Sequence, residues 1–359
     1  MLSSLKVIDI STVLAGPSVG MFFAELGASV TKIEHPNLPD VTRSWKVEQE
    51  DKNAAVSSYF ASINYGKSYI QLNLSDLAQR DSFLALVKDA DILISNFKSS
   101  DYAKFGITTA VLNEINTRLI HGRISGYGID SDRVAYDLIL QAETGFMSMN
   151  GTPASGPVKM PVALIDVLSA HQLKEGILLA LLERSQTNVG KEVNVSLYEA
   201  AICSLVNQAS SYLMNHRIPQ RIGSLHPSIA PYGEIFLTKD GKYITFAIGS
   251  DTQFQKVLHK IGLGNLVEDA RFLSNQLRVQ HRSVLFELME KHLLAFDARE
   301  MLQWSQENFI PCGQIKNLEE VFQEQQAQDL VREEMIDGIL TKRVSSIAFK
   351  YSDNIRKVK

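Results

Sequence analysis

An aspartate near the start of an apolar helical pattern has the most suggestive chemical setting in this sequence. Asp166 follows Pro161 by five residues, and a long apolar helix begins at that point. Its helical face continues with three apolar residues: Ala170, Leu173 and Ile177. Burial against such a face raises a carboxyl pKa, whereas a helix N-terminus stabilises the anion and offers N–H donors to a developing oxyanion. On the pattern alone, an ordinary capping or first-turn acid is the more common interpretation.

Glycines after the first predicted strand suggest a phosphate-binding turn. The turn at 14–17 lies between a strand and a helix, but Gly16 and Gly20 are four residues apart and form no G-x-G-x-x-G array. Pro17 also lacks the N–H group that a phosphate would accept. The spacing therefore favours a plain strand–helix turn over a dinucleotide site.

The other polar side chains form no recognisable metal or nucleophile site. Tyr136 and Asp137 follow the turn-rich segment 126–131, and loop residues of this kind usually lie on the surface. Of the eight histidines, only His281 and His292 share a predicted helical region, and their spacing of eleven suits no ordinary metal pair. The sequence therefore predicts no metal site.

The elements that must position these residues alternate between strand and helix. Strands are expected at 7–10, 28–34, 68–74, 91–97 and 119–125, and helices at 18–26, 76–88, 109–116 and 163–185. Ser18 is expected to cap the first helix and Gly27 to end it. This order predicts an α/β fold with a doubly wound parallel sheet, whose ligands bind beyond the carboxyl ends of the strands.

A change in residue pattern after residue 221 predicts a second, smaller domain. Proline and glycine there separate short strands from helices. The strands are expected at 234–238 and 242–248, and the helices at 253–261, 282–295 and 298–307. We therefore expect a small α+β domain at 221–315.

Composition excludes several classes of protein. The 359 residues are 45% hydrophobic and carry a net charge of −4, with 36 Lys+Arg and 40 Asp+Glu. This balance predicts no nucleic-acid partner, and no run approaches the ~20 apolar residues of a membrane helix. Cys203 and Cys312 match no metal or disulfide spacing, and no signal-peptide pattern is present. A cytoplasmic protein with reduced thiols is expected.

An ordered set of segments supplies a more specific interpretation. The segments are Val-Leu-Ala-Gly-Pro at 13–17, Leu-Gly-Ala-Ser-Val-Thr-Lys-Ile-Glu at 26–34, Asn-Tyr-Gly-Lys-Ser at 64–68, Ser-Asn-Phe at 95–97, Ser-Gly-Tyr-Gly at 125–128, Ala-Tyr-Asp at 135–137, the helix containing Asp166, His-Pro at 226–227 and Ile-Pro-Cys-Gly at 310–313. Together they resemble the family III CoA-transferases, the group of formyl-CoA transferase and carnitine CoA-transferase, whose superfamily includes alpha-methylacyl-CoA racemase. The resemblance covers essentially the whole chain.

The resemblance implies a role for each matching residue. Asp166 would be the catalytic aspartate, which attacks an acyl-CoA thioester and then carries CoA as an aspartyl-CoA thioester. Tyr136 would lie near the acyl group. The CoA-binding positions would be Val13, Ala15, His35, Leu72, Asn96, Phe97 and Lys104, with Lys104 as a phosphate contact. The partners would be an acyl-CoA and a small carboxylic acid, with no metal and no cofactor beyond CoA itself.

Differences within the superfamily favour transfer over racemisation. Racemases have a histidine where this chain has Tyr136, and their later glutamate is replaced around 249–251. A 2-methylacyl-CoA racemase is therefore the second interpretation. A non-catalytic CoA-binding subunit is the third, and the retained Asp166 argues against it. Leu14 replaces a glutamine of the formyl-CoA enzyme, and segment 229–232 lacks that enzyme's glycine-rich loop, which counts against formate and oxalate as substrates.

The resemblance also implies the architecture of the whole molecule. A large Rossmann-like domain would comprise residues 1–200, completed by a C-terminal return at 320–359, with the small domain between them. Two such chains would form an interlocked homodimer, in which each subunit is an open ring threaded by the other.

Overall fold

The chain divides into two compact units in the computed structural model, which describes residues 2–350. Within these residues, unit 1 comprises 2–148, 158–219 and 329–350, and unit 2 comprises 149–157 and 220–328. The last part of the predicted C-terminal return, 351–359, lies outside the described residues. The two segments of unit 2 are thus each inserted in the chain between segments of unit 1.

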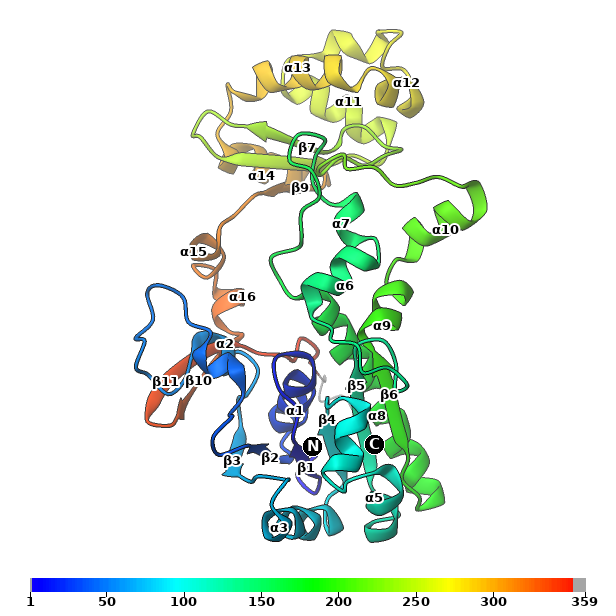
Figure 1. Ribbon diagram of the computed structural model, residues 1–359. Coiled ribbons are helices and arrows are strands. Elements are labelled where there is room, and N and C mark those ends of the chain that lie inside the picture. Colours follow the sequence, from blue (N-terminus) through cyan, green and yellow to red (C-terminus); the bar gives the residue numbers. More distant parts are fainter. Residues whose placement is uncertain (1, 351–359) are drawn as a thin grey trace, which may run out of the picture. The chain divides into compact units, whose positions relative to one another are not determined.

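A six-stranded parallel sheet forms the centre of unit 1 (Figure 1). Its strands lie in the order β3 (Lys67–Gln71), β2 (Ser29–Glu34), β1 (Lys6–Asp9), β4 (Ile92–Ser95), β5 (Ile120–Ser125) and β6 (Glu192–Ser196). The order 3-2-1-4-5-6 is that of the doubly wound Rossmann fold, in which ligands bind where the order reverses, here between β1 and β4. The α/β prediction for this part of the chain is confirmed.

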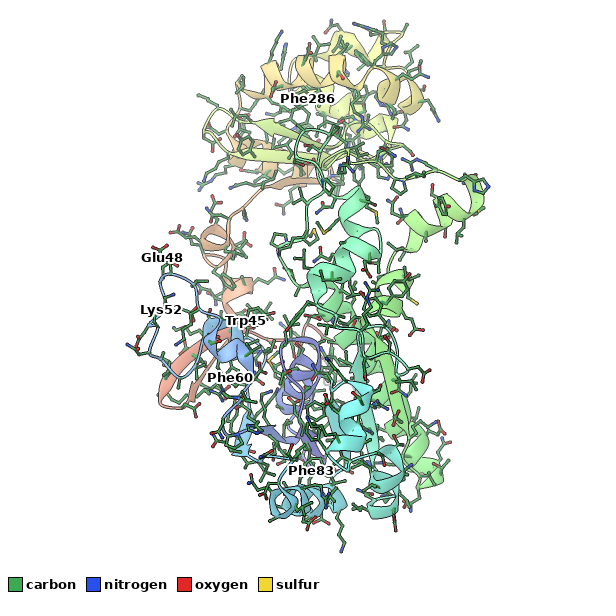
Figure 2. The ribbon with its side chains drawn as sticks, in the orientation of Figure 1. Trp45, Glu48, Lys52, Phe60, Phe83 and Phe286 are labelled. Carbon is green, nitrogen blue, oxygen red and sulfur yellow. The ribbon has the colours of Figure 1, made fainter. Side chains whose placement is uncertain are left out.

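Helices cover both faces of this sheet because successive strand residues point to opposite sides. Val7 belongs to an apolar cluster with residues of α1 (Ala15–Glu25) and α8 (Leu164–Thr187). Its neighbour Ile8 belongs to a second cluster with Phe83 of α3 (Leu77–Lys88), which Figure 2 labels. The helices α4 (Ser99–Lys104) and α5 (Thr109–Ile115) also supply this second cluster.

The first helix begins earlier than the sequence suggested. Leu14 occupies the N-cap position and α1 starts at Ala15, so Ser18 lies inside the helix, and its prediction as the cap was wrong. The Ser18 hydroxyl donates to the Leu14 carbonyl oxygen at 2.8 Å, a local bond that serine also forms inside helices. Gly27 ends the helix as predicted, with φ +94° and its N–H bonded to the Ala24 carbonyl.

A β-hairpin after unit 2 returns to unit 1. Strands β10 (Val331–Ile336) and β11 (Ile339–Val344) pair antiparallel beside α2 (Ser58–Ala61), as Figure 1 shows. Ile336 and Ile339 pack with Phe60, which Figure 2 labels. The other elements of unit 1 are η1 (Val41–Ser44), α6 (Asp137–Glu143), α9 (Leu197–Cys203) and α10 (Val206–Asn215); α7 (Phe146–Met149) lies at the unit boundary.

Unit 2 has its own antiparallel sheet and apolar core. Strands β7 (Tyr232–Leu237), β8 (Tyr243–Ala247) and β9 (Cys312–Gln314) form the sheet. Its helices are α11 (Asp251–Lys260), η2 (Gly264–Glu268), α12 (Asn275–Gln280), α13 (Arg282–Leu293), α14 (Ala298–Glu307), α15 (Leu318–Val321) and α16 (Gln325–Gln328). Phe236 and Phe246 are buried in this core, and Phe286 stacks on Phe236. In neither unit does a described helix combine the length and apolar character needed to cross a membrane.

Candidate active site

Two of the pockets at the ends of the parallel strands in unit 1 adjoin each other. The β2–β3 pocket has a volume of about 130 Å³ and is lined by Ile10, Thr12, Ile33, Glu34, His35, Leu38, Asp40, Leu72, Asn73, Leu74, Phe97 and Phe105. The β4–β5 pocket has a volume of about 340 Å³ and is lined by Thr12, Val13, Asn96, Phe97, Lys98, Ser99, Asp101, Ile124, Ser125, Gly126, Ser131, Arg133, Val134, Ala135, Tyr136 and Leu197. Thr12 and Phe97 line both pockets, so the two are neighbours.

The structure brings most of the predicted CoA-binding residues to these pockets. His35, Leu72 and Phe97 line the β2–β3 pocket, and Val13, Asn96 and Phe97 line the β4–β5 pocket. Tyr136, which was predicted near the acyl group, also lines the β4–β5 pocket. Ala15 and Lys104 line neither. Ala15 is the buried first residue of α1. Lys104 ends α4 with its ammonium 5.5 Å from the ring centroid of Phe105, which lines the β2–β3 pocket.

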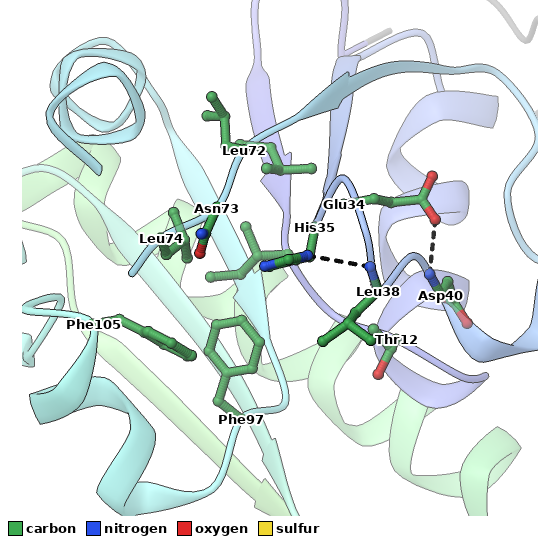
Figure 3. Close-up of a pocket in the computed structure, with 12 residues that line it drawn as sticks. Thr12, Glu34, His35, Leu38, Asp40, Leu72, Asn73, Leu74, Phe97 and Phe105 are labelled. Atoms are coloured by element: carbon green, nitrogen blue, oxygen red, sulfur yellow. Dashed lines mark hydrogen bonds between the residues drawn. The ribbon is translucent and has the colours of Figure 1, made fainter. Parts of the chain in front are cut away.

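The β2–β3 pocket offers apolar walls and one orientated imidazole (Figure 3). The Nδ1 atom of His35 accepts hydrogen bonds from the N–H groups of Asn37 and Leu38, at 3.1 and 3.2 Å. An imidazole that accepts at Nδ1 carries its proton on Nε2 when neutral. The pocket therefore combines a nitrogen donor with aliphatic and aromatic surface, which suits a planar ring bearing acceptor atoms.

The predicted nucleophile lies in the first turn of α8. Asp166 is the third residue of this helix and is 7% exposed. Burial, assisted by the negative charge of Asp137, raises the pKa of Asp166 to about 7. Of the two opposing effects expected from the sequence, burial is therefore the larger. A carboxylate with such a pKa exists in both protonation states near neutral pH, and its anion is poorly solvated and therefore reactive.

Asp137 holds the segment that carries Asp166. One oxygen of its carboxylate accepts the N–H of Ile165 at 2.8 Å, and the other accepts the side-chain amide of Gln141 at 2.7 Å. The side-chain oxygen of Gln141 accepts a hydrogen bond from the backbone N–H of Met160 at 2.8 Å. Asp137 thus binds an N–H group at the start of α8, whereas the sequence suggested an ordinary surface acid. No sequence signal connects residues so far apart.

Tyr59, which was not predicted from the sequence, interacts electrostatically with Asp166 and Asp137. Burial raises the pKa of Tyr59 to about 12, and the charges of Asp166, Asp137 and Asp40 add to the shift. Its phenol therefore stays protonated at neutral pH and can donate a hydrogen bond. The ring of Trp45 contacts Tyr59 edge-on, with 5.2 Å between centroids.

The Asn96 side chain forms two hydrogen bonds with the turn after β1. Its side-chain oxygen accepts the N–H of Thr12 at 3.0 Å, and its side-chain nitrogen donates to the Thr12 carbonyl oxygen at 2.8 Å. The amide thus binds both backbone polar groups of Thr12, and so fixes the two peptide groups on either side of this residue in the turn that borders both pockets.

Comparison with known proteins identifies the family. The model of CoA-transferase family III matches residues 2–355. The chain is 34% identical to the succinate–glutarate CoA-transferase of Agrobacterium fabrum, over 91% of this chain and 83% of that protein. It is 32% identical to the acetyl-CoA:oxalate CoA-transferase of Acetobacter aceti, over 88% and 81% respectively. The crystal structure of a CAIB/BAIF family protein from Brucella suis superimposes with a TM-score of 0.86 at 32% identity, over 98% of this chain and 93% of that one. The chain belongs to CoA-transferase family III.

Proposed function

We propose that this CoA-transferase moves CoA from an acyl-CoA to a free carboxylic acid through a covalent aspartyl-CoA thioester on Asp166. The observation that carries the proposal is the buried carboxylate in the first turn of α8, with its pKa raised to about 7. Burial removes water from the anion, and the helix N-terminus provides positive potential for the oxyanion that forms in each step.

The steps balance without any further reactant. The Asp166 carboxylate attacks the thioester carbonyl, the C–S bond breaks, and CoA leaves as a thiolate from a mixed anhydride. The thiolate attacks the Asp166 carbonyl carbon, which releases the first acid as a carboxylate and leaves aspartyl-CoA. The incoming carboxylate attacks the carbonyl carbon of this thioester, the C–S bond breaks, and a second mixed anhydride and the CoA thiolate form. The thiolate then attacks the acyl carbon of this second anhydride. The product acyl-CoA forms and Asp166 is restored.

CoA would occupy the two neighbouring pockets in this proposal. Its adenine would lie in the β2–β3 pocket against His35, and Lys104 would contact a phosphate. The remaining contacts would come from Val13, Ala15, Leu72, Asn96 and Phe97. Tyr136 and Tyr59 would lie near the acyl group, where the protonated Tyr59 phenol is suited to donate to a carboxylate or oxyanion. No step uses a metal or an organic cofactor.

The acids named for the relatives suggest the substrate class. Succinate, glutarate and oxalate are all dicarboxylic acids, so we expect a short dicarboxylate as donor or acceptor acid. Leu14 and segment 229–232 argued against oxalate, but a relative named for oxalate keeps this acid in the test panel.

We also propose that the chain acts as an interlocked homodimer. The support within unit 1 is a run of exposed apolar side chains on α8, α9, α10 and the residues after them. These are Leu178, Leu179, Leu182, Ile202, Val206, Leu213, Met214 and Ile218. These exposed apolar side chains would supply the apolar surface that such an assembly needs to bury. The cytoplasmic location stays a prediction.

Mass spectrometry of the intact protein and its peptides tests the chemistry. Incubation with succinyl-, glutaryl-, acetyl- and oxalyl-CoA should add CoA to the peptide containing Asp166, and the Asp166→Asn variant should gain no adduct. Absence of any adduct, together with entry of solvent deuterium at the α-carbon of a 2-methylacyl-CoA, would establish a racemase instead. Binding of CoA without either reaction would leave the non-catalytic subunit.

A further inference from the structure

The turn between β1 and α1 contains a residue in an unfavourable backbone conformation. Val13 has φ +71°, in the left-handed region that β-branched residues rarely adopt. Such a conformation is strained and persists only where the surrounding structure enforces it. Val13 lines the β4–β5 pocket and Thr12 lines both pockets, so the conformation of this turn shapes both of them.

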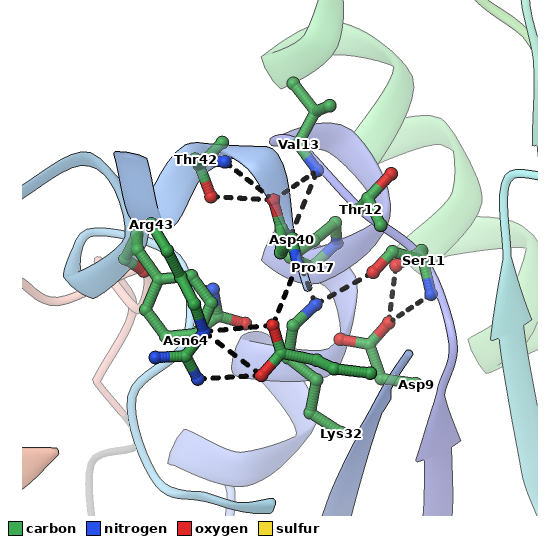
Figure 4. Close-up of polar contacts among 12 residues, drawn as sticks. Asp9, Ser11, Thr12, Val13, Pro17, Lys32, Asp40, Thr42, Arg43 and Asn64 are labelled. Atoms are coloured by element: carbon green, nitrogen blue, oxygen red, sulfur yellow. Dashed lines mark hydrogen bonds and ion pairs between the residues drawn. The ribbon is translucent and has the colours of Figure 1, made fainter. Parts of the chain in front are cut away.

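Buried side chains hold the turn in this conformation (Figure 4). The N–H of Val13 donates to the carboxylate of Asp40, at 3.3 Å from each oxygen. The ammonium of Lys32 donates to the carbonyl oxygen of Ser11 at 2.8 Å. Ser11 and Val13 flank Thr12, whose own N–H and carbonyl groups both bond to the Asn96 amide.

Lys32 and Asp40 form an ion pair beneath the turn. Their charged atoms are 3.2 Å apart, and both side chains are 0% exposed. Thr42 fixes the Asp40 carboxylate with its N–H at 3.1 Å and its hydroxyl at 2.7 Å. A buried pair of this kind adds little net stability compared with apolar residues of similar volume. Its position therefore points to a role in fixing geometry.

We infer that Lys32 and Asp40 are positioning residues for CoA binding. Asp40 holds Val13 in the left-handed conformation, and Lys32 orientates both the Asp40 carboxylate and the Ser11 carbonyl. Together they fix the wall that the two pockets share. This inference rests on the proposed function, because it assumes that CoA occupies these pockets.

Two uncharged versions of the pair test the hydrogen bond to Val13 while the charge is the same in both. Lys32→Met/Asp40→Asn and Lys32→Met/Asp40→Leu both avoid an unpaired buried charge, so both should fold, which thermal melting checks. Only the asparagine version can accept the N–H of Val13. Calorimetric titration with CoA should show about tenfold weaker binding by the leucine version, a ratio that corresponds to ~1.4 kcal/mol.

A glycine at position 13 tests whether the effect passes through Val13. Glycine adopts positive φ without steric cost, so Val13→Gly added to the leucine version should recover most of the lost affinity. Val189→Gly is the matched control. Val189 is exposed, lacks a positive φ and lines neither pocket, so this substitution should recover nothing. A purely structural role for Asp40 would show no such selective rescue.

Three outcomes would overturn the inference or separate it from the proposed function. Equal CoA affinity of the folded asparagine and leucine versions would overturn it, as would failure of Val13→Gly to recover binding. Amide hydrogen exchange in segment 11–15 should be faster in the leucine version, and this measurement needs no CoA. If the leucine version exchanges faster but the wild type binds no CoA, the proposed function is rejected, and the role of Lys32 and Asp40 in CoA binding is rejected with it. The conclusion that these residues fix the conformation of the turn would then still stand.

Discussion

At the scale of single residues, the proposed chemistry depends on the protonation of one buried carboxyl group. Burial and the charge of Asp137 raise the pKa of Asp166 to about 7, and only the ionised form is a nucleophile. Transfer activity, followed as kcat/KM for the acyl-CoA, should therefore rise with pH and level off above about 7. Replacing Asp137 by Asn removes the neighbouring charge while keeping an acceptor for the N–H of Ile165. The rise should then move to lower pH, and an unchanged profile would show that another group controls it.

The same group should make folding stability depend on pH. Asp166 binds its proton more tightly in the folded state than a solvated aspartate does, whose ordinary pKa is 3.8. The free energy of unfolding that it contributes therefore falls as pH rises from about 4 to 7, by up to ~4 kcal/mol. In denaturant unfolding, Asp166→Asn should gain stability relative to the wild type at pH 8 and lose that advantage at pH 4. Asp81→Asn, at an exposed carboxylate with 69% side-chain exposure, should show no such trend.

The sequence pointed to Asp166, the proposed nucleophile, but not to the residues around it. Asp166 could be predicted because its apolar neighbours recur at helical spacing and because the ordered segments resemble a known family. Asp137 and Tyr59 approach it only through the tertiary fold, and no periodicity in one sequence encodes that approach. The same limit applies to Asn96, whose amide fixes a turn that lies 84 residues earlier in the chain.

At the scale of elements, the β10–β11 hairpin is attached to unit 1 by charged contacts. Arg343 donates to Glu25 at the end of α1, and both side chains are at most 5% exposed. Arg43 pairs with Asp337 in the hairpin turn at 2.8 Å. Arg343→Met leaves the Glu25 carboxylate buried without its partner and should lower the free energy of unfolding by about 3–5 kcal/mol.

Denaturant unfolding with a surface control checks this prediction. Lys342→Met breaks the exposed pair with Glu333 on the same hairpin and should cost less than about 1 kcal/mol. Equal losses in the two variants would contradict the importance of the buried pair. The double variant Arg343→Met/Glu25→Gln should recover part of the stability because it also removes the buried charge.

The elements that the sequence predicted best are those with clear hydrophobic periodicity. The expected strand at 28–34 and helix at 76–88 differ from β2 and α3 by one residue at one end. The hairpin was missed although Asp337-Gly338 is a typical two-residue turn signal, with φ +49° and +77° in the structure. Charged residues are consecutive within its strands, at 332–334 and 342–343, so no apolar–polar alternation marks them as strands. The start of α1 was placed too late because Ser18 is a stronger capping residue than Leu14.

At the scale of the whole molecule, the proposed assembly predicts a change in mass. Met214 on α10 is 79% exposed in the single chain. If the exposed apolar residues of α8–α10 contact a second copy, Met214→Asp should reduce the dimer fraction in light scattering after gel filtration, because burying an unpaired carboxylate is costly. Leu77→Asp, on an exposed residue of α3, should leave the mass unchanged. A monomeric wild type would reject the proposed dimer.

The insertion of unit 2 within unit 1 has a consequence for synthesis on the ribosome. Glu25 and Arg43 emerge early, but their partners Arg343 and Asp337 emerge only after residues 220–328 have been translated. The paired residues are 318 and 294 apart in the chain, so at ~5–20 residues per second this delay is on the order of tens of seconds. During that interval the nascent N-terminal part keeps Glu25 without Arg343 at the end of α1 and an uncovered apolar surface around Phe60. The growing chain should therefore be a substrate for ribosome-associated chaperones until its last strand has been made.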